Sequence, residues 1–93
     1  MVNAYPASLD VNEDESVQLV CNCSGNPPPT LQWSITDGSN ISTEANIRRI
    51  GFRRVDLVFN RIKTQNKTYN CSGFSPEGLA WDSVNVVVRG NRR

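Results

Sequence analysis

Hydrophobic and polar residues alternate with a period of two along most of the chain. In residues 17–23, every second side chain is apolar: Val17, Leu19, Cys21 and Cys23. This alternation is typical of a β-strand with one buried face. Residues 30–35, 54–62, 68–75 and 79–88 repeat the pattern, which predicts further strands there.

Turn residues separate these segments. Gly25 to Pro29 includes three consecutive prolines and excludes a helix or a central strand, while Asp37-Gly38 and Ser75 to Gly78 read as tight turns. Residues 2–11 contain Pro6 and predict an edge strand with Leu9 and Val11 on one face. We expect a short strand at residues 47–50, a polar loop with a short strand around Ile41, and a loop at residues 63–67.

The pattern therefore predicts an all-β fold with seven to eight short strands in two packed antiparallel sheets. A chain of 93 residues makes one small domain. We place its core at residues 5–89 and interpret residues 90–93 as a linker or a disordered tail.

Four segments carry a family resemblance: SVQLVCNCSGNPPPTLQW, the Asp37-Gly38 turn after it, LVFNRI, and TYNCSGFSPEG followed by an alternating terminal strand. Trp33 lies between Cys21 and Cys71, and Tyr69 comes two residues before Cys71. A Cys…Trp…Cys spacing that ends in Tyr-x-Cys resembles the immunoglobulin superfamily. The chain is most similar to the I-set or C2-type domains of cell-surface receptors and adhesion proteins.

The resemblance implies an immunoglobulin-like β-sandwich in which a Cys21–Cys71 disulfide bridges the two sheets. Trp33 would be the core indole and Tyr69 the tyrosine-corner residue. A disulfide that closes a loop of this size contributes about 4 kcal/mol in the chain-entropy model. Because disulfides persist in oxidising compartments, we expect an extracellular domain of a longer secreted or membrane-anchored protein.

Three positions depart from the family pattern. The family's Asp-x-Gly-x-Tyr stretch is replaced by Gln65 to Tyr69, and Asp14 stands where glycine is usual. Cys23 replaces a small residue. The alternation points Cys23 inward, which favours a buried free thiol. Pairing of Cys23 with Cys71, or with another chain, remains open at this stage.

The composition leaves little for catalysis. The chain has no histidine, which removes imidazole acid–base chemistry, and its glycines form no phosphate-binding motif. No Cys or Asp spacing matches a metal site. We therefore expect no enzyme activity, cofactor or metal.

Four asparagines begin N-glycosylation sequons: Asn22, Asn40, Asn66 and Asn70. Asn22 and Asn70 neighbour inward-facing cysteines and are expected to face solvent. Asn40 and Asn66 fall in expected loops, and Asn66 is the strongest candidate. The alternative is that these are ordinary surface asparagines.

Two surfaces are candidates for partner binding. Around one turn the sequence places four arginines that could converge: Arg48, Arg49, Arg53 and Arg54. They would form a patch for an acidic protein or a polyanion such as heparan sulfate, or merely protect an edge strand. Phe74 and Trp81 face outward on either side of the Ser75–Gly78 turn, where an exposed aromatic pair marks a binding surface or packs locally.

We therefore expect a protein-recognition domain of an adhesion protein or receptor at the cell surface. One alternative is a structural spacer that contacts only neighbouring immunoglobulin domains in a tandem array. Another is an intracellular, muscle-type immunoglobulin domain, which the sequons and the cysteine pair disfavour. A nucleic-acid partner is not expected outside the cell.

Overall fold

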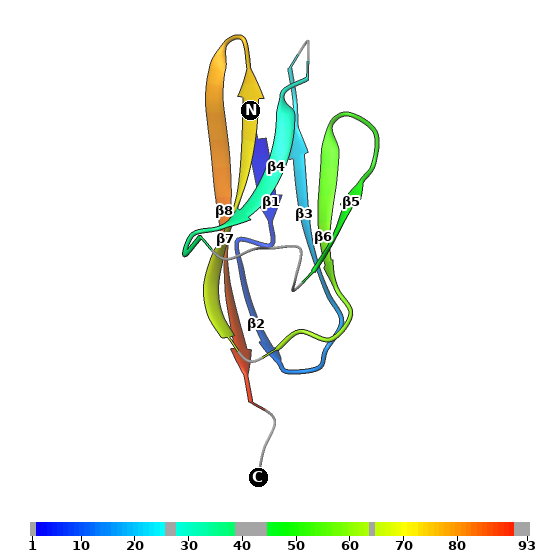
Figure 1. The fold of residues 1–93 in the computed structure, drawn as a ribbon, viewed down its shortest axis with the longest axis vertical. Helices are drawn as coiled ribbons and strands as arrows, with labels where there is room; N and C mark the ends of the chain where they lie inside the picture. Colours follow the sequence, from blue (N-terminus) through cyan, green and yellow to red (C-terminus); the bar gives the residue numbers. More distant parts are fainter. Residues whose placement is uncertain (1, 26–27, 39–44, 64, 91–93) are drawn as a thin grey trace.

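The computed structural model describes residues 2–25, 28–38, 45–63 and 65–90. These residues form eight strands: β1 (Val2–Tyr5), β2 (Ser8–Asn12), β3 (Val17–Cys23), β4 (Thr30–Ile35), β5 (Asn46–Arg49), β6 (Arg54–Phe59), β7 (Gln65–Ser75) and β8 (Gly78–Arg89). They pack as two sheets, which we call the β6 sheet (order β1-β3-β6-β5) and the β7 sheet (order β2-β8-β7-β4) (Figure 1). The predicted all-β sandwich is confirmed.

The first predicted strand is two strands, one in each sheet. β1 pairs with β3 in the β6 sheet, and β2 pairs with β8 in the β7 sheet, where the two strands run parallel. Pro6 lies between them and has no N–H to continue a ladder, so the chain changes sheets there. Both sheets are therefore antiparallel except at this pair. Val2 and Ala4 of β1 are buried in the core.

β7 begins earlier than the alternation predicted. Residues 65–67 were expected in a loop, but Asn66 pairs with Val87 and Lys67 with Val86. These polar residues have no apolar alternation of their own, and the valines of β8 supply the pairing surface. The expected strand around Ile41 lies outside the described residues. Within those residues, no helix is long and apolar enough to cross a membrane.

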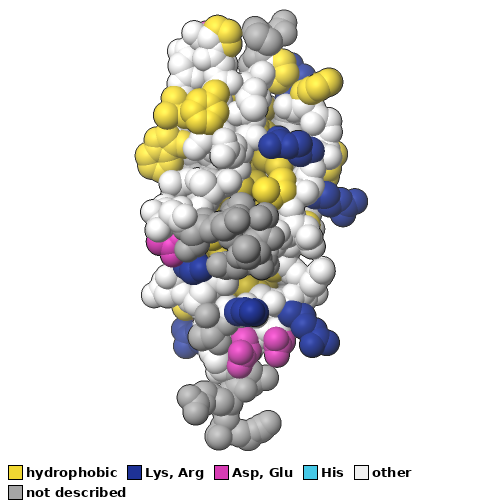
Figure 2. Space-filling model, in the orientation of Figure 1, with side chains coloured by type: hydrophobic (Ala, Val, Ile, Leu, Met, Phe, Trp, Pro, Cys, Tyr) yellow, Lys and Arg dark blue, Asp and Glu magenta, His cyan; other side chains and the backbone are white. Residues whose placement is uncertain are grey.

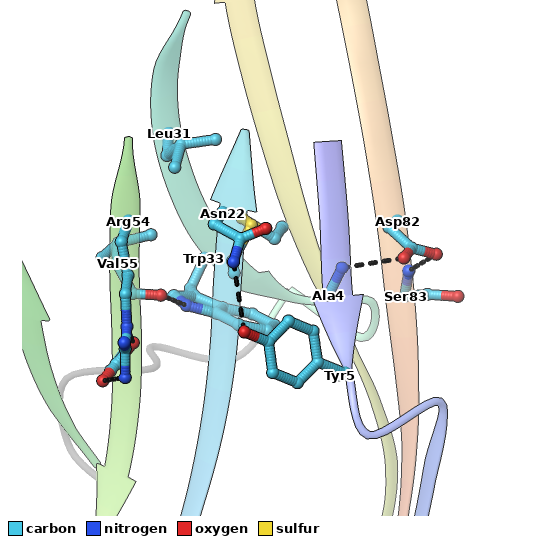
Figure 3. Close-up of a disulfide and its surroundings, with 12 residues drawn as sticks. Ala4, Tyr5, Asn22, Leu31, Trp33, Arg54, Val55, Asp82 and Ser83 are labelled. Atoms are coloured by element: carbon cyan, nitrogen blue, oxygen red, sulfur yellow. Dashed lines mark hydrogen bonds and ion pairs between the residues drawn. A yellow bond between two sulfur atoms is a disulfide. The ribbon is translucent and has the colours of Figure 1, made fainter. Parts of the chain in front are cut away.

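The core between the sheets contains the Cys21–Cys71 disulfide, with Cα atoms 6.4 Å apart. The bridge joins β3 to β7 and therefore joins the two sheets, and Cys23 stays a buried free thiol. The Trp33 Nε1–H donates a 3.0 Å hydrogen bond to the Val55 carbonyl, a second link between the sheets (Figure 3).

Tyr69 is fully buried on β7, two residues before Cys71. Its ring meets the edge of Phe59 at a centroid distance of 5.6 Å. Its hydroxyl donates to Gln65 Oε1 at 2.5 Å. Gln65 occupies the first position of the stretch that departs from the family pattern, and its amide provides the acceptor for the tyrosine hydroxyl.

Asp14 adopts a positive φ of 69° in the turn before β3. This left-handed conformation explains why glycine is usual here, because glycine has no Cβ to strain. The Asp14 N–H donates to the Ile62 carbonyl at 2.8 Å, which holds the turn against the segment that follows β6.

Candidate recognition surface

An apolar cluster lies on the outer face of the β7 sheet, next to the β7–β8 turn. Phe74 and Leu79 are direct cross-strand partners, and Trp81 is a diagonal neighbour of Phe74 because it pairs with Ser72. These three side chains are 50%, 60% and 61% exposed, respectively. Figure 2 shows hydrophobic side chains gathered over the end of the molecule where the β7–β8 turn lies. The sequence predicted the outward direction of Phe74 and Trp81, and Leu79 extends the pair to a cluster.

No charged side chain interrupts this face on the strands around the cluster, within the part of the chain that the structure describes. The alternation of buried and exposed positions places these neighbours on the outer face: Thr30, Gln32, Ser34, Asn70, Ser72 and Ser83. Glu77 lies in the β7–β8 turn, and Asp82 follows Trp81 on β8 but belongs to the opposite face of the strand. Depletion of charge around exposed aromatic residues is typical of the core of a protein–protein interface.

Asp82 anchors the strand that carries Trp81. Its carboxylate accepts hydrogen bonds from the Ala4 N–H at 2.8 Å and from the Ser83 N–H at 2.9 Å (Figure 3). The first of these bonds joins β8 to β1 of the opposite sheet. The cluster therefore lies on a strand held in place from both sides, which reduces the ordering cost of binding.

The outer face of the β6 sheet contains a buried carboxylate. Asp56 is fully buried, although it points away from the core, because neighbouring side chains cover it. Arg54 donates to its two oxygens at 2.9 and 3.0 Å, and Gln18 donates at 2.6 Å. The hydrogen bond to Asp56 raises the pKa of Arg54 above its ordinary value.

Three of the four arginines of the basic block are engaged by acceptors within the domain, and two of them, Arg49 and Arg54, line one groove. Arg54 is engaged with Asp56, Arg49 donates to the Leu31 carbonyl at 3.0 Å, and Arg53 donates to the Gly25 carbonyl at 2.9 Å. Arg48 is exposed on the edge strand β5.

The sequence did not predict a groove beside the β5–β6 hairpin. It has a volume of about 260 Å³ and is lined by Pro29, Leu31, Arg49 and Phe52, among others. Phe52 is 85% exposed at the β5–β6 turn. The sequence feature that could have indicated this groove is an aromatic residue in a turn between arginines, but alternation does not predict which way a turn residue faces.

The described residues contain no cluster of three or more His, Cys, Asp or Glu that could hold a metal ion.

The sequons have different surroundings. The Asn22 Nδ2 donates to the Tyr5 hydroxyl at 3.1 Å (Figure 3), so this nitrogen is engaged beside a bulky ring. Asn66 is exposed, but it lies on β7 and not in the loop expected for it. Asn70 is half-buried between Ser34 and Ser83, which have small side chains. Asn40 lies outside the described residues.

Comparison with known protein families shows which family the chain belongs to. A family model described as an immunoglobulin domain matches residues 1–73. The chain belongs to the immunoglobulin-domain family. Immunoglobulin domains with these core contacts act in many proteins, so family membership alone leaves the role of this one open.

The curated relatives are much longer proteins. The chain is 28% identical to human hemicentin-1, a match that covers 94% of this chain and 2% of that protein. It is 29% identical to chicken inactive tyrosine-protein kinase 7, covering 81% of this chain and 7% of that protein. A human protein named probable oxidoreductase PXDNL is 28% identical over 90% of this chain and 6% of its own length. The chain thus spans only a small part of each relative.

Among solved structures, the chain resembles immunoglobulin domains of titin. Titin domains Z1Z2 in complex with telethonin match with a TM-score of 0.81 and 22% identity, covering 98% of this chain and 48% of that chain. The titin M10–obscurin-like 1 immunoglobulin complex matches with a TM-score of 0.77 and 20% identity, covering 92% and 89%. At this identity the likeness concerns the fold alone.

Proposed function

We propose that this immunoglobulin domain is an extracellular protein-recognition module that binds a protein partner through the outer face of the β7 sheet. The observation that carries the proposal is the cluster of Phe74, Leu79 and Trp81 on a face without charged neighbours. An exposed aromatic cluster on a rigid strand pair has the composition of an interface hot spot. Removal of this surface from water would supply the binding free energy, and no chemical step is needed.

The Cys21–Cys71 disulfide supports the extracellular part of this proposal, because disulfides persist in oxidising compartments. Comparable domains occur within the much longer proteins hemicentin-1 and inactive tyrosine-protein kinase 7. We propose accordingly that the domain belongs to a larger secreted or membrane-anchored protein.

The alternative function is a structural spacer in a tandem array. The molecule is elongated, with extents of 51 × 22 × 21 Å, and β1 begins near one end while β8 finishes at the other (Figure 1). This arrangement suits domains joined end to end. A spacer needs no conserved side-chain contacts on the outer face of its sheet, so a test on that face separates the two functions.

The groove at Phe52 and the arginines around it favour a second binding mode, in which an acidic protein or heparan sulfate is the ligand. We rank it lower because Arg49, Arg53 and Arg54 already donate to acceptors within the domain. Electrostatic binding to a polyanion gains most from guanidinium groups that are grouped and unengaged.

Three variants distinguish these functions. The glycan-free, oxidised domain is multimerised and applied to an array of extracellular proteins as wild type, Trp81→Ala, Phe52→Ala and Arg53→Glu. We expect Trp81→Ala to lose partners and the other two variants to retain them, with the melting temperature unchanged because all three residues are exposed. Phe52→Ala controls for the loss of any exposed aromatic residue. Loss on Arg53→Glu alone would favour the basic surface, and no loss in any variant would favour the spacer.

A further inference from the structure

Asn70 lies on the same outer face as the apolar cluster and close to Trp81. It pairs with Ser83 on β8, and Trp81 is two residues from Ser83. Side chains in this diagonal relation lie about 7 Å apart between their Cβ atoms. The sequon hydroxyl belongs to Ser72, which stands directly opposite Trp81.

The surroundings of Asn70 leave room for a sugar. Its two cross-strand neighbours are Ser34 and Ser83, whose side chains are short, and no hydrogen bond within the described residues engages the Asn70 amide. The Asn22 nitrogen, by contrast, is bonded to the Tyr5 hydroxyl. Asn66 is exposed but faces Val87, with no aromatic residue at the positions opposite or diagonal to it.

We propose that Asn70 carries an N-linked glycan whose first sugar rings pack on the indole of Trp81 and close the apolar cluster to protein partners. The role of the glycan as a gate rests on the proposed function of the cluster, whereas the contact with Trp81 does not. Occupancy of Asn70 then sets whether this face binds a partner or is covered by the domain's own sugar.

The modification is a group transfer from a polyisoprenyl-diphosphate-linked oligosaccharide. The Asn70 Nδ2 forms a bond to C1 of the first N-acetylglucosamine, and the bond between C1 and the diphosphate oxygen breaks. The polyisoprenyl diphosphate leaves with the electron pair of that bond, and a base of the transferase takes one Nδ2 proton. No oxidation or reduction occurs.

The physical basis of the contact is the exposed face of the indole. Trp81 is 61% exposed on the outer face of the β7–β8 pair, and no charged side chain on this face of the neighbouring strands competes for its π-surface in the described residues. The C–H groups on one side of a pyranose carry partial positive charge, which is attracted to the electron-rich face of an aromatic ring. Covering this surface also removes an apolar patch from water.

Tryptophan fluorescence gives a direct readout. The chain has two tryptophans, and Trp33 is only 2% exposed, so quenching by acrylamide reports on Trp81. The protein is secreted from eukaryotic cells as wild type, Asn70→Gln, Ser72→Ala and Asn66→Gln, and site occupancy is measured by peptide mass spectrometry. Trimming of the wild type to a single N-acetylglucosamine tests whether the first ring is sufficient.

We expect Asn70 to be occupied and the quenching constant of wild type to be roughly half that of Asn70→Gln, because a sugar covers one of the two faces of the indole. Ser72→Ala removes the same sequon without changing Asn70 and should match Asn70→Gln. Asn66→Gln is the matched control, on the same strand and face, and should match wild type. An unmodified Asn70, or equal quenching with and without its glycan, would overturn the proposal.

The gate is tested separately from the function. Partners that the glycan-free domain binds through Trp81 should bind secreted Asn70→Gln about tenfold or more tightly than secreted wild type, since burial of a central aromatic residue is worth at least this much. Equal affinity would overturn the gate. If Trp81→Ala changes no interaction of Asn70→Gln, the proposed function fails, and the quenching result still decides whether the glycan contacts Trp81.

Discussion

At the scale of single residues, two positions that depart from the family pattern keep the backbone conformation or the hydrogen bond expected there, with a different type of residue. Asp14 adopts the left-handed backbone that glycine usually provides, and Gln65 supplies the acceptor for Tyr69. The turn still needs a residue with positive φ, which Asp14 adopts at some cost in backbone strain. The Tyr69 hydroxyl still needs an acceptor, which the Gln65 side chain provides.

Asp14→Gly is expected to stabilise the domain by about 0.5 kcal/mol, because relief of the left-handed strain exceeds the added entropy of the unfolded chain. Asp14→Val is the opposing control and should destabilise the domain by more than about 1 kcal/mol, because a β-branched residue with positive φ is strongly disfavoured. Urea unfolding of both variants provides the measurement. If Asp14→Gly is clearly less stable than wild type, the side chain of Asp14 has a role beyond tolerating the turn.

Tyr69→Phe should destabilise the domain by about 1–2 kcal/mol, because it removes a buried hydroxyl and leaves the Gln65 acceptor without this donor. Gln65→Ala should cost a similar amount. In the double variant, the two effects should not add, because they remove the same hydrogen bond. Additive losses in chemical denaturation would show that Tyr69 and Gln65 stabilise the fold independently.

At the scale of elements, β2 pairs with residues 85–89 of β8 and forms one edge of the β7 sheet. An exposed ion pair reinforces it: Arg89 donates to Asp10 Oδ1 and Oδ2, each at 2.9 Å. The hydrogen bond from Arg89 lowers the pKa of Asp10 below its ordinary value of 3.8. Because the folded-state pKa of Asp10 lies below its unfolded value, the ion pair contributes its full stabilisation at pH values above the unfolded pKa. This stabilisation is lost as the pH falls through the folded-state pKa.

Arg89→Gln should therefore melt slightly below wild type at neutral pH, and the difference should shrink as the pH falls below the ordinary aspartate pKa and through the lower folded-state pKa of Asp10. Added salt at neutral pH should also reduce the difference, because the pair is exposed. Thermal melts over this pH series measure the effect. A difference in melting temperature that stays the same at pH 2 and pH 7 would exclude the ion pair as its cause.

The elements also show which parts of the fold are readable from the chain. Alternation located the inward faces of β3, β4 and β6, because burial on one face imposes a period of two. It missed the division at Pro6 and the start of β7 at Gln65, since both depend on which strand lies alongside. Asp56 is buried on an outer face, where Arg54 and Gln18 donate hydrogen bonds to its carboxylate. The spacing of the arginines in the basic block does not show which acceptors their long side chains reach, so their hydrogen bonds within the domain could not be predicted from the sequence.

At the scale of the whole molecule, the two sheets have different outer surfaces. The β6 sheet presents an ion pair and an exposed arginine, whereas the upper part of the β7 sheet presents aromatic, aliphatic, hydroxyl and amide groups. The Cys21–Cys71 core holds both in fixed relation. Outward-facing Phe74 and Trp81 were predictable from parity, but the uncharged setting that makes them an interface candidate required the register of three strands.

The most direct test of recognition by an uncharged face is the salt dependence of binding. The affinity of the glycan-free domain for a partner from the extracellular array is measured by surface plasmon resonance at low and high sodium chloride, for wild type and Trp81→Ala. An apolar interface predicts a Kd that changes by less than about twofold between the two salt concentrations, because few charges are screened. Trp81→Ala should raise the Kd by about tenfold or more. A Kd that rises steeply with salt and is unaffected by Trp81→Ala would contradict the account.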